Sequence, residues 1–210
     1  MQAFLMRFLI LSSCLFALWG CGTVYKQLPI TNGSTANLQK LKPAFTVALY
    51  NTNINVVGNH LSGLLLIKRM PDSTLRMVFS NEMGFTFFDF EFAPGGGFKV
   101  YSIIKKMKKK SVIKTLRKDF ELLLMEGLND NNVTIRKDNT DLFYIFPQSK
   151  GFNCYITNST GSEMVRMERA SSQKTVVEMI MKNYTNGIPD TIGISHKTFD
   201  FTIGLKRIER

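Results

Sequence analysis

The chain has 210 residues, of which 44% are hydrophobic and 20% charged, and it contains 17 Phe and 11 Met. This composition excludes a chain that is disordered throughout, and the length suits one domain with a buried core. The formal net charge is +11, from 27 basic and 16 acidic residues, which points to an anionic partner.

The first predicted element is an apolar run over residues 8–20, preceded by a single charge at Arg7. It is too short to span a bilayer as a stable helix, so we interpret residues 1–20 as a cleaved export signal. The run ends in Leu18-Trp19-Gly20-Cys21, which resembles the cleavage site of a bacterial lipoprotein signal peptide. An ordinary secretory signal or a membrane anchor is the alternative.

The lipoprotein resemblance implies lipid attachment at Cys21, with a thioether-linked diacylglycerol and an acylated amine, palmitate being the expected kind of chain. Several acyl chains hold a protein firmly to a membrane, whereas a single chain binds only marginally. Gly22 follows the cysteine where an Asp would retain many lipoproteins in the inner membrane. We therefore expect an outer-membrane anchor on the periplasmic side.

Residues 21–43 are polar and rich in turn formers, among them Pro29, Asn32-Gly33-Ser34 and Pro43. Such a composition is typical of a flexible tether. We expect it to join the anchor to a single folded domain over residues 44–210.

From Phe45 onward, runs rich in β-branched and aromatic residues alternate with turn signals such as Gly58-Asn59 and Pro71-Asp72. This pattern predicts a meander of strands. Five are expected before the first helix, over residues 45–57, 61–69, 75–80, 85–92 and 98–104.

One helix is predicted, over residues 111–126. Apolar residues recur there at helical spacing, namely Val112, Ile113, Leu116, Phe120, Leu123 and Leu124, and charged residues occupy the opposite face. Ser111 is expected to cap the N-terminus, and Gly127 is expected to end the helix.

Seven more strands are predicted, over residues 134–137, 142–146, 152–157, 164–169, 175–182, 191–196 and 199–208. In the last, Phe199, Phe201 and Ile203 alternate with polar residues, so one face of the sheet should be buried. Twelve short strands do not make one flat sheet. We predict a mainly β (α+β) fold, a strongly curved antiparallel half-barrel of 11–12 strands with the helix on its concave side.

The excess positive charge is concentrated between Lys99 and Lys118, where nine basic residues occur without an acidic one. For an exported, lipid-anchored protein, this segment predicts contact with anionic headgroups, because each surface lysine near such lipid contributes about 1 kcal/mol. The contacting residues would be Lys105, Lys106, Lys108, Lys109 and Lys110. A solvated loop that only keeps the domain soluble is the alternative.

Three segments resemble the LolA/LolB-like superfamily of lipoprotein carriers and receptors: Leu61-Ser62-Gly63-Leu64-Leu65-Leu66, Arg76-Met77-Val78-Phe79 and Gly84-Phe85-Thr86-Phe87-Phe88. They are similar to the family's glycine-bearing strand, its basic-residue strand and its Gly-x-Thr strand opening. The resemblance implies an incomplete antiparallel barrel whose helical lid encloses an apolar cavity. The chain departs from the family in having one strong helix where the well-known members have more.

Some strands are apolar on both faces, whereas a half-buried sheet needs only one apolar face. The surplus apolar surface must be covered by the helix, by a ligand or by another protein. With the cavity that the resemblance implies, we expect acyl chains to bind between sheet and lid, against Leu64, Leu66, Phe88, Phe90, Val112, Leu116, Phe120 and Leu123. A dry core without a pocket is the alternative.

Taken together, these features predict an outer-membrane-anchored periplasmic lipoprotein that binds lipid acyl chains or a lipidated partner without catalysis. The expected partners are the membrane and a lipid or lipoprotein cargo, with no nucleic acid, and the oligomeric state stays open. The alternative is a structural or accessory envelope lipoprotein that docks another protein and has no lipid cavity.

No motif for catalysis stands out, and no cofactor or metal is expected. His60 and His196 lack metal-ligand spacing. Asp89 and Glu91 lie two residues apart on a predicted strand, and we interpret them as part of its wet face. Cys154 is expected to be a small buried hydrophobe.

Two short segments, Asp72-Ser73-Thr74 and Asp190-Thr191-Ile192, resemble the acceptor sequence of periplasmic O-glycosylation in some bacteria. Both fall near predicted turns. Ser73 and Thr191 are therefore candidate modification sites.

Overall fold

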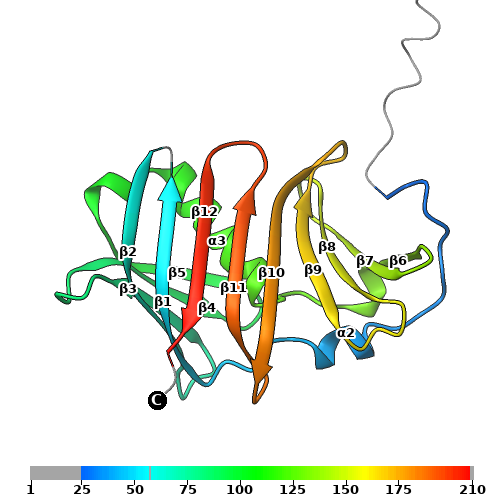
Figure 1. The fold of residues 1–210 in the computed structure, drawn as a ribbon, viewed down its shortest axis with the longest axis horizontal. Coiled ribbons are helices and arrows are strands. Elements are labelled where there is room, and N and C mark those ends of the chain that lie inside the picture. Colours follow the sequence, from blue (N-terminus) through cyan, green and yellow to red (C-terminus); the bar gives the residue numbers. More distant parts are fainter. Residues whose placement is uncertain (1–24, 57, 209–210) are drawn as a thin grey trace, which may run out of the picture.

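The computed structural model describes residues 25–56 and 58–208 (Figure 1). The export signal over residues 1–20 and the lipid attachment at Cys21 lie outside the described residues, so both stay predictions. Within the described ranges, no helix is long and apolar enough to cross a membrane.

Twelve antiparallel strands form one open sheet in the order β5-β4-β3-β2-β1-β12-β11-β10-β9-β8-β7-β6. The strands are β1 (Val47–Val56), β2 (Asn59–Arg69), β3 (Leu75–Ser80), β4 (Thr86–Ala93), β5 (Gly97–Ile103), β6 (Thr134–Lys137), β7 (Asp141–Pro147), β8 (Phe152–Asn158), β9 (Met164–Ala170), β10 (Thr175–Thr185), β11 (Ile188–His196) and β12 (Phe201–Arg207). The predicted twelve-strand antiparallel sheet is confirmed. Its edge strands β5 and β6 do not pair with each other, so it does not close.

The sheet bends around α3 (Lys110–Leu123), which lies behind it in Figure 1. Phe120 of α3 contacts Phe88 of β4, with ring centroids 5.8 Å apart, and the neighbouring Asp119 lies 3.0 Å from Arg169 of β9. β4 and β9 are seven strand spacings apart in the sheet order, about 33 Å along the sheet. A helix is only about 10–12 Å across. Two adjacent residues therefore reach both strands because the sheet curls around the helix.

Strand alternation decides which side chains face α3. In β2, Leu65 and Ile67 are buried, and Leu65 pairs with the buried Phe79 of β3. Leu64 and Leu66 are half-buried on the outer face, so our prediction that they face the helix was wrong. Residues 64–67 are all apolar, so the sequence pattern does not show which of them face the helix. A shift of one residue would exchange the two faces of the strand.

α3 begins and ends earlier than predicted. Lys109 is its N-cap, without a side-chain capping bond, so Ser111 lies inside the helix. The helix ends at the C-cap Leu124, and Met125 adopts a positive φ of 50° before Gly127 does so at 77°. Two short 3₁₀ helices flank α3, η1 (Lys105–Met107) and η2 (Asp130–Asn132).

Residues 25–43 form a strap that packs on the sheet, and the described part is thus not the flexible tether that we predicted. The Tyr25 hydroxyl donates a 2.6 Å hydrogen bond to Glu168 of β9. Ile30 forms an antiparallel bridge with Arg136 of the edge strand β6. The strap thereby covers an edge that would otherwise expose unpaired backbone groups.

The strap continues into α2 (Ala36–Lys40), a helix that the sequence pattern did not predict. Leu38 of α2 is completely buried in the main core. One apolar side chain in a polar stretch is a weak signal by itself, but its burial holds the segment against the domain.

Candidate functional site

One rim of the sheet, the upper one in Figure 1, gathers three segments that are distant in sequence. They are the β1–β2 hairpin, the β11–β12 hairpin, and residues 104–109 between β5 and α3. Tyr25, the first described residue, lies at the same rim because its partner Glu168 stands near the end of β9.

A pocket of about 510 Å³ opens at this rim, between the sheet and the N-terminal half of α3. We call it the rim pocket. The sheet side contributes Ile54, Val56, Leu61, Phe199 and Phe201, and the helix side contributes Met107, Val112 and Leu116. Lys106 and Lys109 also line it, so two cations border a mainly apolar space. Its volume lies within the range of small-molecule sites.

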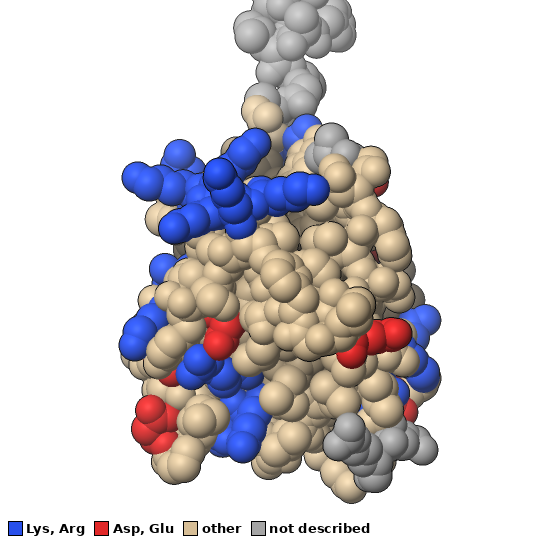
Figure 2. All heavy atoms as spheres, turned by 90° about the vertical axis from the view of Figure 1, so that its left-hand side faces the viewer, with Lys and Arg blue, Asp and Glu red and all other residues tan. Residues whose placement is uncertain are grey.

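The lysine cluster, which comprises Lys105, Lys106, Lys108, Lys109 and Lys110, is exposed at every member. Figure 2, which views the molecule from the left-hand side of Figure 1, shows Lys and Arg side chains gathered along the upper edge. No member forms an ion pair with a residue that the structure describes. The positive charge beside the rim pocket is therefore uncompensated and open to an anion.

The residues predicted to line a cavity divide into two groups. Val112 and Leu116 line the rim pocket. Phe88, Phe90, Phe120 and Leu123 are at most 1% exposed and pack in the closed core, with the Phe88 and Phe90 ring centroids 4.5 Å apart. These four residues, like Leu64 and Leu66 on the outer face, do not line the rim pocket.

Sequence reasoning missed Ile54, Met107, Phe199 and Phe201 as pocket residues. The alternation of the last strand placed Phe199 and Phe201 on one face, which was the only local signal. In the structure Phe199 precedes β12 and remains 44% exposed. Nothing in the sequence shows that this hairpin meets the start of α3.

A buried polar group fastens α3 beside the rim pocket. Asp119 is completely buried, with Oδ2 2.9 Å from His196 Nε2 and Oδ1 3.0 Å from Arg169 Nη1. The His196 ring packs against Phe199 and Phe201, each with centroids 4.7 Å away. Because both phenylalanines line the rim pocket, the Asp119 contacts link the helix to the pocket wall.

The two acidic residues of β4 are held in separate contacts on the outer face. Arg76 donates to both oxygens of Asp89, at 2.5 and 2.7 Å, and this bonding raises the pKa of the Arg76 guanidinium. The Tyr101 hydroxyl donates to Glu91 at 3.0 Å. Each carboxylate thus already has a partner, as expected for the wet face of a strand.

The remaining candidate residues, His60 and Cys154, do not gather with other described residues into a catalytic or metal site. His60 is exposed on β2, with Nδ1 2.7 Å from Asn55 Oδ1. Within the described ranges, no three His, Cys, Asp or Glu residues gather as a metal site would require. Cys154 is completely buried, and burial raises the pKa of its thiol well above the usual value.

The two candidate glycosylation sites lie in different settings. Ser73 is exposed in the β2–β3 turn, with a φ of 68°. Thr191 lies inside β11, opposite Lys182 and Lys206, because the nearby turn is formed by Asn186 and Gly187 and β11 begins at Ile188, earlier than predicted. Only Ser73 has the exposed turn geometry that a glycan needs.

No model of a known protein family matches the sequence, and no curated protein matches it. A LolA superfamily protein from Nitrosomonas europaea matches in structure with a TM-score of 0.50 and 8% identity, over 85% of this chain and 93% of its own. A DUF1329 family protein from Desulfovibrio piger matches with a TM-score of 0.45 and 10% identity, over 85% and 92%. A candidate outer membrane lipoprotein-sorting protein domain from Vibrio parahaemolyticus matches with a TM-score of 0.46 and 8% identity, over 84% and 90%.

The first of these similarities shows that the chain shares the fold of the LolA superfamily, which is the fold that the sequence resemblance implied. At 8% identity, it shows the fold alone.

Proposed function

We propose that this protein, whose fold is that of the LolA superfamily, is an outer-membrane-anchored periplasmic lipoprotein that binds an acyl chain in the rim pocket. The chain would belong to an anionic lipid or to a lipidated partner. The observation that carries the proposal is the pairing of an apolar pocket with two bordering cations, Lys106 and Lys109. Burial of apolar surface contributes about 25 cal/mol per Å², and each lysine near anionic lipid about 1 kcal/mol.

The position of Tyr25 supports an orientation in which the rim pocket faces the membrane. The hydrogen-bond partner of Tyr25, Glu168, stands near the end of β9, which reaches the same rim as the β11–β12 hairpin and residues 104–109. Tyr25 follows Cys21 by four positions, and an extended chain of four residues spans at most about 14 Å. A lipid anchor at Cys21 would therefore keep this rim close to the bilayer. There the protein would bind and release the acyl chain without covalent chemistry.

The test uses the mature chain from residue 21 with Cys21→Ser, because the strap belongs to the fold. We expect native mass spectrometry to find copurified lipid. We also expect flotation with phosphatidylcholine vesicles to require added phosphatidylglycerol. A lipid-free protein that ignores both kinds of vesicle would remove the proposal.

Matched variants locate the site. Val112→Gln should lose bound lipid, whereas Ile113→Gln, half-buried on the same helix but outside the rim pocket, should keep it. Lys106→Glu with Lys109→Glu should abolish binding to anionic vesicles. The control pair Lys68→Glu with Lys137→Glu, two exposed lysines outside the rim pocket, should bind like the parent chain.

The alternative function, an accessory lipoprotein that docks another protein, is favoured by a different observation. Two neighbouring strands, β9 and β10, pair only as far as Met179 and Met167 and then separate.

A further inference from the structure

β9 and β10 separate before either strand ends. Their pairing runs from Thr175↔Ala170 to Met179↔Met167 and then stops. β10 continues over residues 180–185, paired with β11 alone, and the first residues of β9, 164–166, pair with β8 alone. Along these two facing edges, backbone groups have no strand partner among the described residues, and such edges can accept an added strand.

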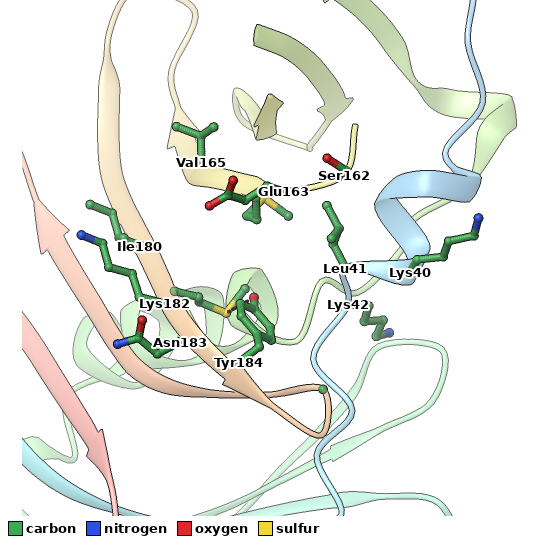
Figure 3. Close-up of a pocket in the computed structure, with 13 residues that line it drawn as sticks. Lys40, Leu41, Lys42, Ser162, Glu163, Val165, Ile180, Lys182, Asn183 and Tyr184 are labelled. Atoms are coloured by element: carbon green, nitrogen blue, oxygen red, sulfur yellow. Dashed lines mark hydrogen bonds between the residues drawn. The ribbon is translucent and has the colours of Figure 1, made fainter. Parts of the chain in front are cut away.

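The separation leaves a pocket of about 660 Å³, which we call the notch. Figure 3 shows the notch between the diverging strands, with Val165 on β9, Ile180 and Tyr184 on β10, and Leu41 from the segment after α2. Val165 and Tyr184 are 39% and 40% exposed, so apolar surface stays uncovered there. The notch includes Gly187 of the β10–β11 turn, at the end of β11 opposite the β11–β12 hairpin, and it shares no lining residue with the rim pocket, so it is a second, separate site.

The charge around the notch is predominantly positive. Lys40, Lys42 and Lys182 line it, with Glu163 as the one acidic lining residue. Lys42 lies 3.4 Å from Glu126, whereas Lys40 and Lys182 form no ion pair with any described residue. An occupant that carries carboxylates would complement these two lysines.

We propose that the notch binds an extended segment of a partner protein, added as a strand, in which acidic residues alternate with apolar ones. The two backbone edges would supply hydrogen bonds, and alternate side chains would meet the lysines and the apolar surface. The free part of β10, residues 180–185, spans about 20 Å, enough for a strand of about six residues. The proposal does not depend on lipid binding in the rim pocket.

The probe is a pool of fluorescent hexapeptides in which Asp or Glu alternates with Val, Ile, Leu or Phe, titrated against the Cys21→Ser mature chain. We expect saturable binding by fluorescence anisotropy. The same pool with alternate N-methylated amides should bind at least tenfold more weakly, because it has lost strand donors. A pool with Lys in place of the acidic residues should not bind.

Charge-reversal variants test the position. The double variant Lys40→Glu with Lys182→Glu should no longer bind the acidic peptides and should bind the lysine peptides instead. The control Lys68→Glu with Lys137→Glu should bind both pools as the parent chain does. Circular dichroism checks that each variant is folded. Hydrogen exchange should slow at residues 180–185 when the pool is bound.

Three results would each overturn the proposal. They are no saturation below about 1 mM peptide, equal binding of the N-methylated pool, or protection at the rim pocket instead of β10.

Discussion

Asp119 Oδ2 and His196 Nε2 lie 2.9 Å apart inside the molecule and join α3 to β11. The two side chains are 0% and 1% exposed, and Arg169 of β9 reaches the other oxygen of the same carboxylate. One carboxylate therefore fastens the helix to two strands on the inner face of the sheet.

Replacing this carboxylate should destabilise the fold. Asp119→Asn leaves the Arg169 charge without its partner, and breaking a buried ion pair typically costs about 3–5 kcal/mol. Urea unfolding measures the loss. Lys118→Gln, at the neighbouring position, should stay within about 0.5 kcal/mol of the parent chain. An Asp119→Asn variant as stable as the parent would show that the pair does not fasten the helix.

Gly63 should not tolerate a side chain. A Cβ at this position would lie 2.1 Å from the backbone oxygen of Ser80, whereas at Gly193 it would meet nothing within 4 Å. We expect Gly63→Ala to lower the free energy of unfolding by about 1–3 kcal/mol through overpacking. Gly193→Ala is the control and should be neutral or slightly stabilising. Equal midpoints for both variants in thermal unfolding would contradict this.

Cys154 should resist alkylation in the folded Cys21→Ser mature chain. Burial raises the pKa of its thiol, so the reactive thiolate is scarce at pH 8, and the side chain is fully covered. Mass spectrometry after iodoacetamide treatment should find modification only in denaturant. In Val165→Cys, the new cysteine replaces an exposed side chain and should react without denaturant. Rapid labelling of Cys154 in the native chain would mean that its surroundings open readily.

Removing the strap should damage the domain. A chain that begins at residue 44 lacks the buried Leu38 and uncovers the outer face, where Tyr25 packs 5.0 Å from Phe143 and 6.2 Å from Phe152. We expect it to aggregate in size-exclusion chromatography and to bind a hydrophobic dye. The Cys21→Ser mature chain is the control. A monomeric residue 44–210 chain with an unchanged unfolding midpoint would show that the strap is dispensable.

The strands could be predicted from the sequence because their signals are local. β-branched and aromatic runs, separated by turn residues, mark all twelve. Errors occurred at boundaries: the strands predicted to end at residue 182 and to begin at residue 191 extend to a turn formed by Asn186 and Gly187, with φ values of 54° and 75°, and Pro189 already belongs to β11. An Asn-Gly pair is the usual two-residue hairpin turn.

The rim pocket could be predicted only in part, because its walls come from segments far apart in the sequence. Helical spacing identified Val112 and Leu116. It could not show that Ile54 and Phe199 would stand opposite them, because that depends on how the sheet curls. Helical spacing also did not predict that the charged Asp119 would be buried, because its partners His196 and Arg169 lie on strands far along the chain.

The pairing of the strap with β6 has a mechanical consequence. A pull on the N-terminus acts first on the Tyr25–Glu168 hydrogen bond and then on a few bonds around Ile30 and Arg136, before it reaches the long ladders of the sheet. Peeling the 19 residues from 25 to 43 would release about 60 Å of chain. We expect a force-extension trace to show this release as an early step, after which the folded sheet could move well away from its anchor.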